Sequence, residues 1–140
     1  EGGQRQFVAA PVTRARGGSI APLLDTIRQR LDEDWPVRRM SQQAGLSRRT
    51  LTRRFNDMVG EPPRAWLLRA RLDRAAELLE TSNAAPPDIA EACGFGSLET
   101  FRREFRKSRG VPPAVFRKAF GGPAALASAR QRQASAAGTA

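Results

Sequence analysis

The sequence has no histidine, no tyrosine and a single cysteine, Cys93. The lack of histidine excludes Ser-His-Asp triads, Cys-His pairs and most zinc sites, and one cysteine excludes disulfide frameworks and cysteine metal clusters. No apolar run is long enough to span a membrane. Cys93 falls on the inward face of a short predicted helix, where we expect a buried apolar residue. Little remains for catalysis, so we expect neither enzymatic activity nor a cofactor or metal.

Positive charge is in large excess. Lysine and arginine number 24 against 14 acidic residues, which gives a net charge of +10 over 140 residues. Only Lys107 and Lys118 are lysines, so the remaining basic residues are all arginine. This balance indicates a polyanionic partner, nucleic acid before a membrane surface. Nothing in the sequence suggests export, so we expect a cytoplasmic protein.

The chain divides into a folded body and two polar ends. Residues 1–19 begin without methionine and are rich in glycine and arginine, so we expect a linker from a missing N-terminal domain. Residues 121–140 contain only one large apolar residue, Leu126, and are expected to form a disordered tail. The body over 20–120 shows helical periodicity and no strand-like alternation, which predicts an all-α class with seven helices.

Prolines, glycines and serines mark the predicted helix ends. Ser19 is expected to cap a first helix over 20–34. The further predicted segments are a first helix-turn-helix over 37–60, a linker helix over 63–80, a second helix-turn-helix over 86–110 and a last helix over 113–120. Met58, Val115 and Phe120 are expected to point into the core.

An internal repeat underlies these segments. Each copy is a short helix, a glycine-containing turn, a serine-capped longer helix, and a Gly-x-Pro-Pro step into another helix, which is the layout of a helix-turn-helix. A shift of 50 residues brings together Ser47 with Ser97, Leu51 with Phe101, Arg53 with Arg103, Phe55 with Phe105, and Gly60 with Gly110.

The second helix of such a unit enters the major groove, where its exposed N-terminal face reads base edges. Arginine can bond guanine O6 and N7, glutamate can accept from the cytosine amino group, and leucine or threonine methyls can touch the thymine methyl. The predicted base contacts are Arg48, Arg49, Thr52 and Arg53 in the first copy, and Leu98, Glu99, Thr100, Arg102 and Arg103 in the second. The predicted phosphate contacts are Ser47, Thr50, Arg54, Ser97, Arg106 and Lys107.

Charge is concentrated on the two reading helices. Residues 48–54 carry a net +4 and residues 102–109 also +4, whereas residues 20–34 carry −2. A solvated helix face would explain one such cluster, but two clusters, each after a turn and a serine cap, favour DNA contact. The predicted linker helix, about 27 Å long, could hold the reading helices in major grooves about 34 Å apart. The expected DNA site is asymmetric because the two helices differ.

The spacing of these motifs resembles the AraC/XylS family of transcription regulators over residues 20–120. The resemblance rests on Gly94-Phe95-Gly96-Ser97, residues 101–107, Gly110-Val111-Pro112-Pro113 and Phe116-Arg117, with Ala44-Gly45-Leu46-Ser47, Leu51, Arg53, Phe55, Gly60 and Pro62 in the first copy. It implies a seven-helix DNA-binding domain with base contacts at Arg49, Thr52, Arg53, Leu98, Glu99, Thr100 and Arg103. Leu98 and Glu99 depart from the amide side chains of some members, and Phe116 replaces the usual tyrosine.

The resemblance also implies partners: double-stranded DNA, RNA polymerase and a missing N-terminal effector and dimerisation domain. Residues 2–7 are similar to the linker of a subgroup whose N-terminal half is glutamine-amidotransferase-like. The acidic residues at 25 and 32–34 fit either a solvated helix end or a surface for RNA polymerase or an upstream domain. Two other functions stay open, namely sequence-neutral architectural binding and the DNA-binding module of a larger DNA-repair enzyme.

Overall fold

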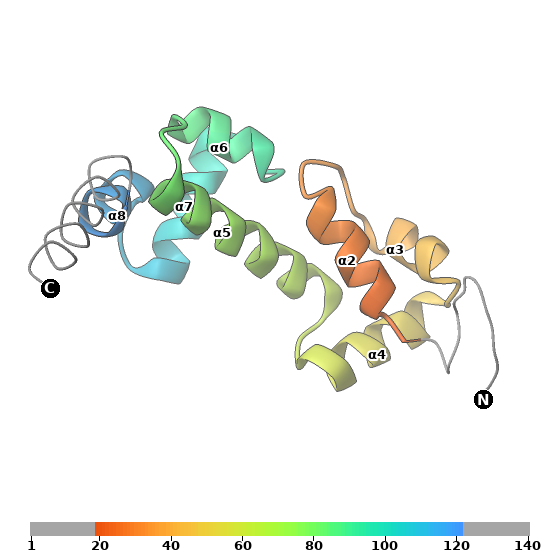
Figure 1. Cartoon of the computed structure of the whole chain (residues 1–140). Helices are drawn as coiled ribbons and strands as arrows, with labels where there is room; N and C mark the ends of the chain where they lie inside the picture. Colours follow the sequence, from red (N-terminus) through yellow and green to blue (C-terminus); the bar gives the residue numbers. More distant parts are fainter. Residues whose placement is uncertain (1–18, 122–140) are drawn as a thin grey trace, which may run out of the picture. The chain divides into compact units, whose positions relative to one another are not determined.

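The computed structural model describes residues 19–121, which form seven α-helices and no strand within that range (Figure 1). The predicted all-α class is confirmed. The expected linker up to residue 18 and the expected tail from residue 122 lie outside the described residues. The helices are α2 (Ala21–Gln29), α3 (Val37–Ala44), α4 (Arg48–Val59), α5 (Pro63–Thr81), α6 (Pro86–Ala92), α7 (Leu98–Arg109) and α8 (Pro113–Phe120). They form two compact units, and the chain passes from one to the other within α5, at residues 70 and 71.

In the first unit, α3 packs against both α2 and α4, and the start of α5 completes the core. The ring of Phe55 meets that of Trp66 edge-on, with centroids 5.9 Å apart. Apolar side chains from all four helices bury one another, which removes them from water and stabilises the unit. The buried core residues are Ile20, Leu23, Leu24, Ile27, Leu31, Trp35, Met40, Leu51, Phe55, Trp66 and Leu67.

The first helix is shorter than predicted. It ends at Gln29 instead of running to residue 34, and its N-cap is Ile20, although the Ser19 hydroxyl accepts the Ala21 N–H at 3.3 Å. Side chains fix the turn that follows: the indole of Trp35 donates to the Arg30 carbonyl at 2.9 Å. The Arg39 guanidinium stacks on Trp35 at 3.8 Å and bonds a Glu33 carboxylate oxygen at 2.6 Å. These contacts replace the helical bonds that the longer helix would have made.

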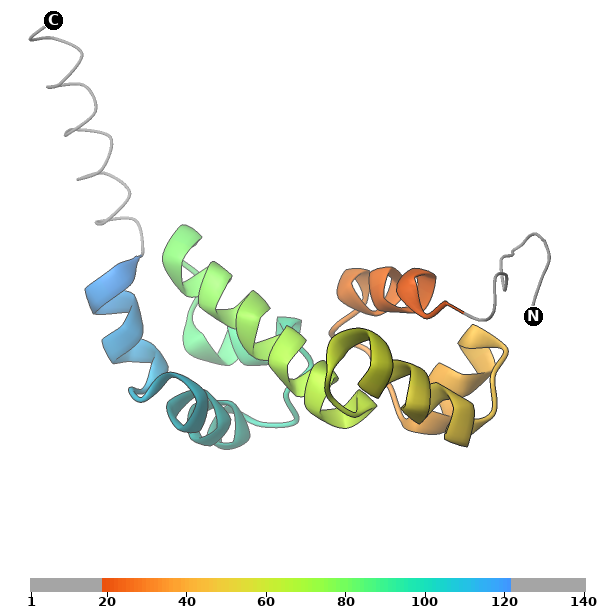
Figure 2. The same ribbon diagram turned by 90° about the horizontal axis from the view of Figure 1, so that it is seen from below.

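In the second unit, a row of phenylalanines links the turn after α6 with α7 and α8. Centroid distances are 5.0 Å from Phe95 to Phe101, 5.7 Å from Phe101 to Phe105 and 5.2 Å from Phe105 to Phe116. Figure 2 shows α7 and α8 as neighbours, consistent with their direct packing. The last two pairs meet edge-to-face, an arrangement that adds to the stability that burial alone provides.

Three residues predicted to face the core are exposed: Met58 by 52%, Val115 by 48% and Phe120 by 63%. In α4 the core-facing residue after Phe55 is Val59, one helical step of four residues further on, so Met58 turns outward. In α8 the buried position belongs to Phe116. Phe120 is the last residue of that helix, and the centroid of its ring lies 4.8 Å from that of Phe116.

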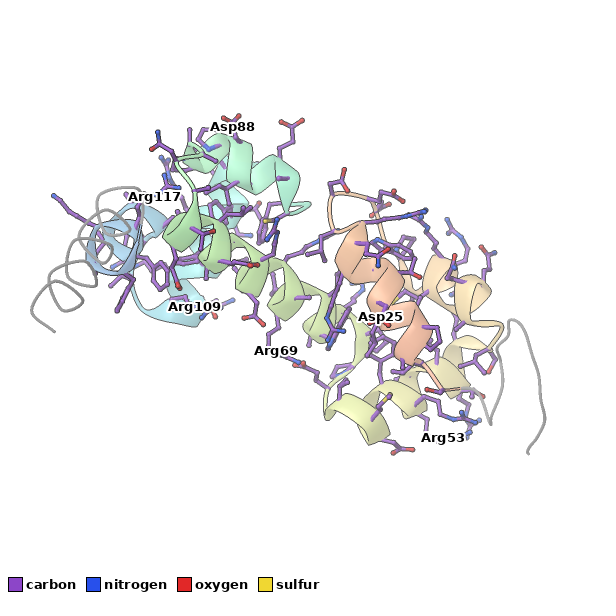
Figure 3. All side chains as sticks on the ribbon, viewed as in Figure 1. Asp25, Arg53, Arg69, Asp88, Arg109 and Arg117 are labelled. Atoms are coloured by element: carbon purple, nitrogen blue, oxygen red, sulfur yellow. The ribbon has the colours of Figure 1, made fainter. Side chains whose placement is uncertain are left out.

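The C-terminus of α5 is held by α8. The Arg117 guanidinium donates to the carbonyls of Leu79 at 3.2 Å and Ser82 at 3.1 Å (Figure 3). The last carbonyls of a helix lack internal partners and carry partial negative charge. An arginine there supplies both hydrogen-bond donors and a positive charge. The chain then passes so close to α5 that a Cβ on Gly121 would lie 2.1 Å from the Glu80 Cα. Gly121, the first residue of the expected tail, is therefore buried in the fold.

Replacing Phe105 by alanine is expected to cost about 3–5 kcal/mol of unfolding free energy, because it leaves a cavity among the phenylalanines. Urea denaturation measures this. The matched control, Phe120→Ala, removes the same side chain from an exposed position and is expected to change stability far less. Equal losses in the two variants would contradict the burial difference.

Replacing Gly121 by alanine is expected to destabilise the second unit by about 1–3 kcal/mol, because the new methyl group meets the α5 backbone rather than a flexible side chain. A thermal melt reports the effect. Gly96→Ala is the control, since a Cβ there meets nothing within 4 Å. A Gly121→Ala variant with the same melting temperature as the unaltered protein would refute the close approach.

Candidate nucleic-acid interface

Both copies of the repeat make an equivalent hydrogen bond in the turn between two helices, although the second turn is longer. The Leu46 N–H donates to the Ser41 carbonyl at 3.0 Å after α3, and the Phe95 N–H donates to the Ala90 carbonyl at 2.9 Å after α6. The turn glycine has a φ of 69° at Gly45 and 87° after α6, a left-handed conformation that a side chain would strain. Each unit is thus a helix-turn-helix.

The two longer helices begin with the same cap. The Ser47 hydroxyl accepts the Thr50 N–H at 3.1 Å and donates to the Thr50 hydroxyl at 3.0 Å. Ser97 makes the same two bonds with Thr100, both at 3.0 Å. Serine is therefore occupied within the cap, and the threonine hydroxyl keeps its own hydrogen for an outside acceptor such as a phosphate oxygen. Thr50 and Thr100, predicted for different roles, occupy equivalent positions.

Each helix buries one face and exposes the opposite one. Leu51 and Phe55 are fully buried in α4, as are Phe101 and Phe105 in α7. Arg49 and Arg53 in α4, and Glu99 and Arg103 in α7, lie about half a turn from these buried pairs, and Figure 3 shows Arg53 projecting from α4. Exposed members are Arg48, Arg49, Arg53, Glu99, Arg102 and Arg103, while Thr52, Leu98 and Thr100 are half-buried. The structure thus leaves six of the nine predicted base-contact residues accessible to a partner.

The predicted phosphate contacts border these faces. Ser47, Ser97, Arg106 and Lys107 are exposed, whereas Thr50 and Arg54 are half-buried. Arginine and lysine side chains at such positions can neutralise phosphates without reading sequence.

The first helices of the two helix-turn-helix motifs, α3 and α6, differ in charge, which the predictions from the sequence did not include. Arg38 is exposed near the start of α3, whereas α6 exposes Asp88 and Glu91. Figure 3 shows Asp88 on α6. In a helix-turn-helix this first helix crosses the DNA backbone. Arg38 is thus a further candidate for phosphate contact, and comparing the charges of the two repeat copies would have found it.

Among residues 19–121, no three histidine, cysteine or acidic side chains are grouped to hold a metal ion. None of the helices there is both long and apolar enough to cross a bilayer. Cys93 is buried as expected, and burial raises the pKa of its thiol to about 11 despite the opposing effect of Arg74 and Arg71. A thiol so protonated is a poor nucleophile.

The acidic residues near α2 are partly paired. Asp25 lies 3.6 Å from Arg28, and Glu33 binds Arg39. Part of this group therefore supports the α2–α3 turn.

Residues 40–119 match the sequence profile of a family described as a helix-turn-helix domain. The chain is 42% identical over 81 residues to the HTH-type transcriptional regulator Rv1931c of Mycobacterium tuberculosis, covering 58% of this chain and 31% of that protein. It is 33% identical over 99 residues to a putative AraC-like transcription regulator of Streptomyces lividans, covering 71% and 33%. The chain thus spans about a third of the length of these relatives.

Solved structures show the same fold. The DNA-binding domain of AdpA, a global transcriptional factor in complex with a target DNA, matches with a TM-score of 0.69 and 36% identity, covering 72% of this chain and 91% of that one. An AraC-type transcriptional regulator from Chromobacterium violaceum matches with a TM-score of 0.67 and 27% identity, covering 71% and 89%.

Cys93 is expected to resist thiol reagents at pH 8 in the folded protein and to react readily in urea, because only unfolding exposes it. Since the folded-state pKa is raised from 9.0 to about 11, the folded protein retains a proton that the unfolded chain loses. Stability should therefore fall as pH rises between these values. Labelling with Ellman's reagent tests the burial of the thiol, and urea melts at several pH values test the loss of stability. Rapid labelling of the folded protein would contradict the burial.

Proposed function

The chain belongs to the AraC-type helix-turn-helix family and is the DNA-binding domain of a transcriptional regulator, and from this premise we propose that α4 and α7 read base edges in successive major grooves. The observation that carries this proposal is the repeated serine-capped helix with a buried pair behind it and an exposed polar face in front. The predicted base-contact residues do the reading, and the predicted phosphate contacts, together with Arg38, hold the backbone.

The length of α5 supports the two-groove proposal. This helix has 19 residues, begins in one unit and ends in the other, and is about 28 Å long at 1.5 Å per residue. Successive major grooves on one side of B-DNA lie about 34 Å apart, so a helix of this length suits the task. The AdpA domain, which shares the fold, is in complex with a target DNA.

Sequence-specific binding is favoured over sequence-neutral binding by the chemistry of the exposed faces. A protein that contacts only phosphates needs positive charge. The N-terminus of α7 instead carries Leu98 and Glu99, and neither an apolar nor an acidic side chain attracts a phosphate. Both residues suit contact with base edges. The domain would then bind DNA without catalysing a reaction on it.

We propose that an N-terminal domain supplies effector binding and dimerisation, since the chain spans about a third of its relatives. RNA polymerase is a proposed partner, with the exposed acidic residues Asp25, Asp32 and Asp34 as the contact surface. Such a regulator would act in the cytoplasm, because bacterial DNA is located there.

Selection of bound DNA from a random pool tests the proposal. We expect two unlike half-sites about one helical turn apart, with a preference over random DNA of about 10³ or more. Arg53→Ala or Arg103→Ala should weaken specific binding by about 1–3 kcal/mol and relax one base position.

Arg106→Ala is the matched control, because loss of a phosphate contact lowers affinity on all sequences and reduces the salt slope by about one. A single protected groove in footprinting would overturn the two-groove proposal. Equal binding to random DNA would favour the architectural alternative.

A further inference from the structure

The reading helices α4 and α7 share one backbone design. Each has 12 residues, starts after a serine that bonds the threonine three residues on, and ends at a left-handed glycine, Gly60 or Gly110. Each buries its fourth and eighth residues. Because each helix is oriented by its own cap and its own buried pair, residues with the same helix position have the same placement within their units.

The second and sixth residues of each helix lie opposite the buried pair. Positions four apart are neighbours on a helix surface, so these two residues form one reading pair: Arg49 with Arg53 in α4, and Glu99 with Arg103 in α7. All four are exposed. The sixth position is arginine in both helices, whereas the second carries opposite charges.

Glu99 is not engaged in the ion pair that its spacing favours. A glutamate four residues before an arginine commonly pairs with it on a helix. Here the Arg103 Nε lies 3.5 Å from the Glu104 carboxylate instead, and Glu99 forms no ion pair within residues 19–121. Its carboxylate therefore remains on the reading face.

A carboxylate in the major groove requires a hydrogen-bond donor. Cytosine offers its N4 amino group, whereas adenine places the acceptor N7 beside its N6 amino group, and guanine offers only acceptors. A carboxylate is repelled by those acceptors, so cytosine is the base it fits. Arginine has the opposite preference and bonds guanine O6 and N7.

We propose that Arg49 and Glu99 read corresponding positions of the two half-sites with reversed preference: guanine opposite Arg49 and cytosine opposite Glu99. Arg53 and Arg103 then select guanine in both half-sites. The DNA site would hold two related half-sites that share one base pair and carry another in reversed orientation. This inference rests on the proposed function and specifies the DNA sequence that α7 accepts.

The experiment is selection of bound DNA from a random pool by the whole chain and by two variants at one position. Glutamine replaces glutamate with almost the same shape and bonds adenine N6 and N7, while arginine bonds guanine. We expect one base of one half-site to change from cytosine to adenine in Glu99→Gln and to guanine in Glu99→Arg. Each change should be about 5- to 150-fold in relative affinity, and the other half-site should stay unaltered.

Glu91→Arg is the control, because it makes the same change of charge in the same unit but on α6. It is expected to raise affinity for all sequences without altering the selected bases. Thermal melts verify that every variant folds.

The outcomes separate the inference from the proposed function. A bipartite motif that keeps the same bases in both Glu99 variants overturns the role of Glu99 and leaves the proposed function intact. A base change that also appears in Glu91→Arg likewise overturns the role of Glu99, because the change of charge alone would then be responsible. No selected motif from the unaltered protein overturns both.

Discussion

The burial of two apolar side chains, four residues apart, on each reading helix is the constraint on which the rest depends. Leu51 and Phe55 in α4, and Phe101 and Phe105 in α7, are fully removed from water. Rotating either helix about its axis would expose this surface, at a cost of several kcal/mol. The buried pair therefore decides which residues face outward. This apolar contact orients the predicted base-contact residues, while the serine caps fix the start of each helix.

The two units show how one backbone design carries two surfaces. Caps, turns and buried positions are repeated, because they satisfy the same backbone hydrogen bonds and fill the same core. Exposed positions make no such contacts and differ between the two helices: α4 has arginine at its second position, where α7 has Glu99. A chain with two unlike helix-turn-helix units can recognise an asymmetric DNA sequence, which a symmetric dimer of a single unit does not.

The second unit is closed by its last residues. Arg117 supplies donors to the free carbonyls at the end of α5, and Gly121 allows the backbone of the chain to approach Glu80. Arg117 is therefore a structural residue even though it belongs to a strongly basic chain. Positive charge alone does not identify a DNA contact, because a guanidinium can equally stabilise a helix C-terminus.

The sequence alone determined the all-α class, the repeat, the serine caps and the buried pairs, because these follow from local spacing and from the conformations that serine, proline and glycine favour. It could not place residues whose environment depends on distant neighbours. Met58 and Phe120 have core-like spacing, yet both are exposed in the described part of the chain. Trp35 and Arg39 make contacts across the turn that follows α2, where the sequence predicts further helix. Only the tertiary structure revealed that Arg103 pairs with Glu104 and that Gly121 packs on α5, since both depend on side-chain directions and backbone distances that periodicity does not encode.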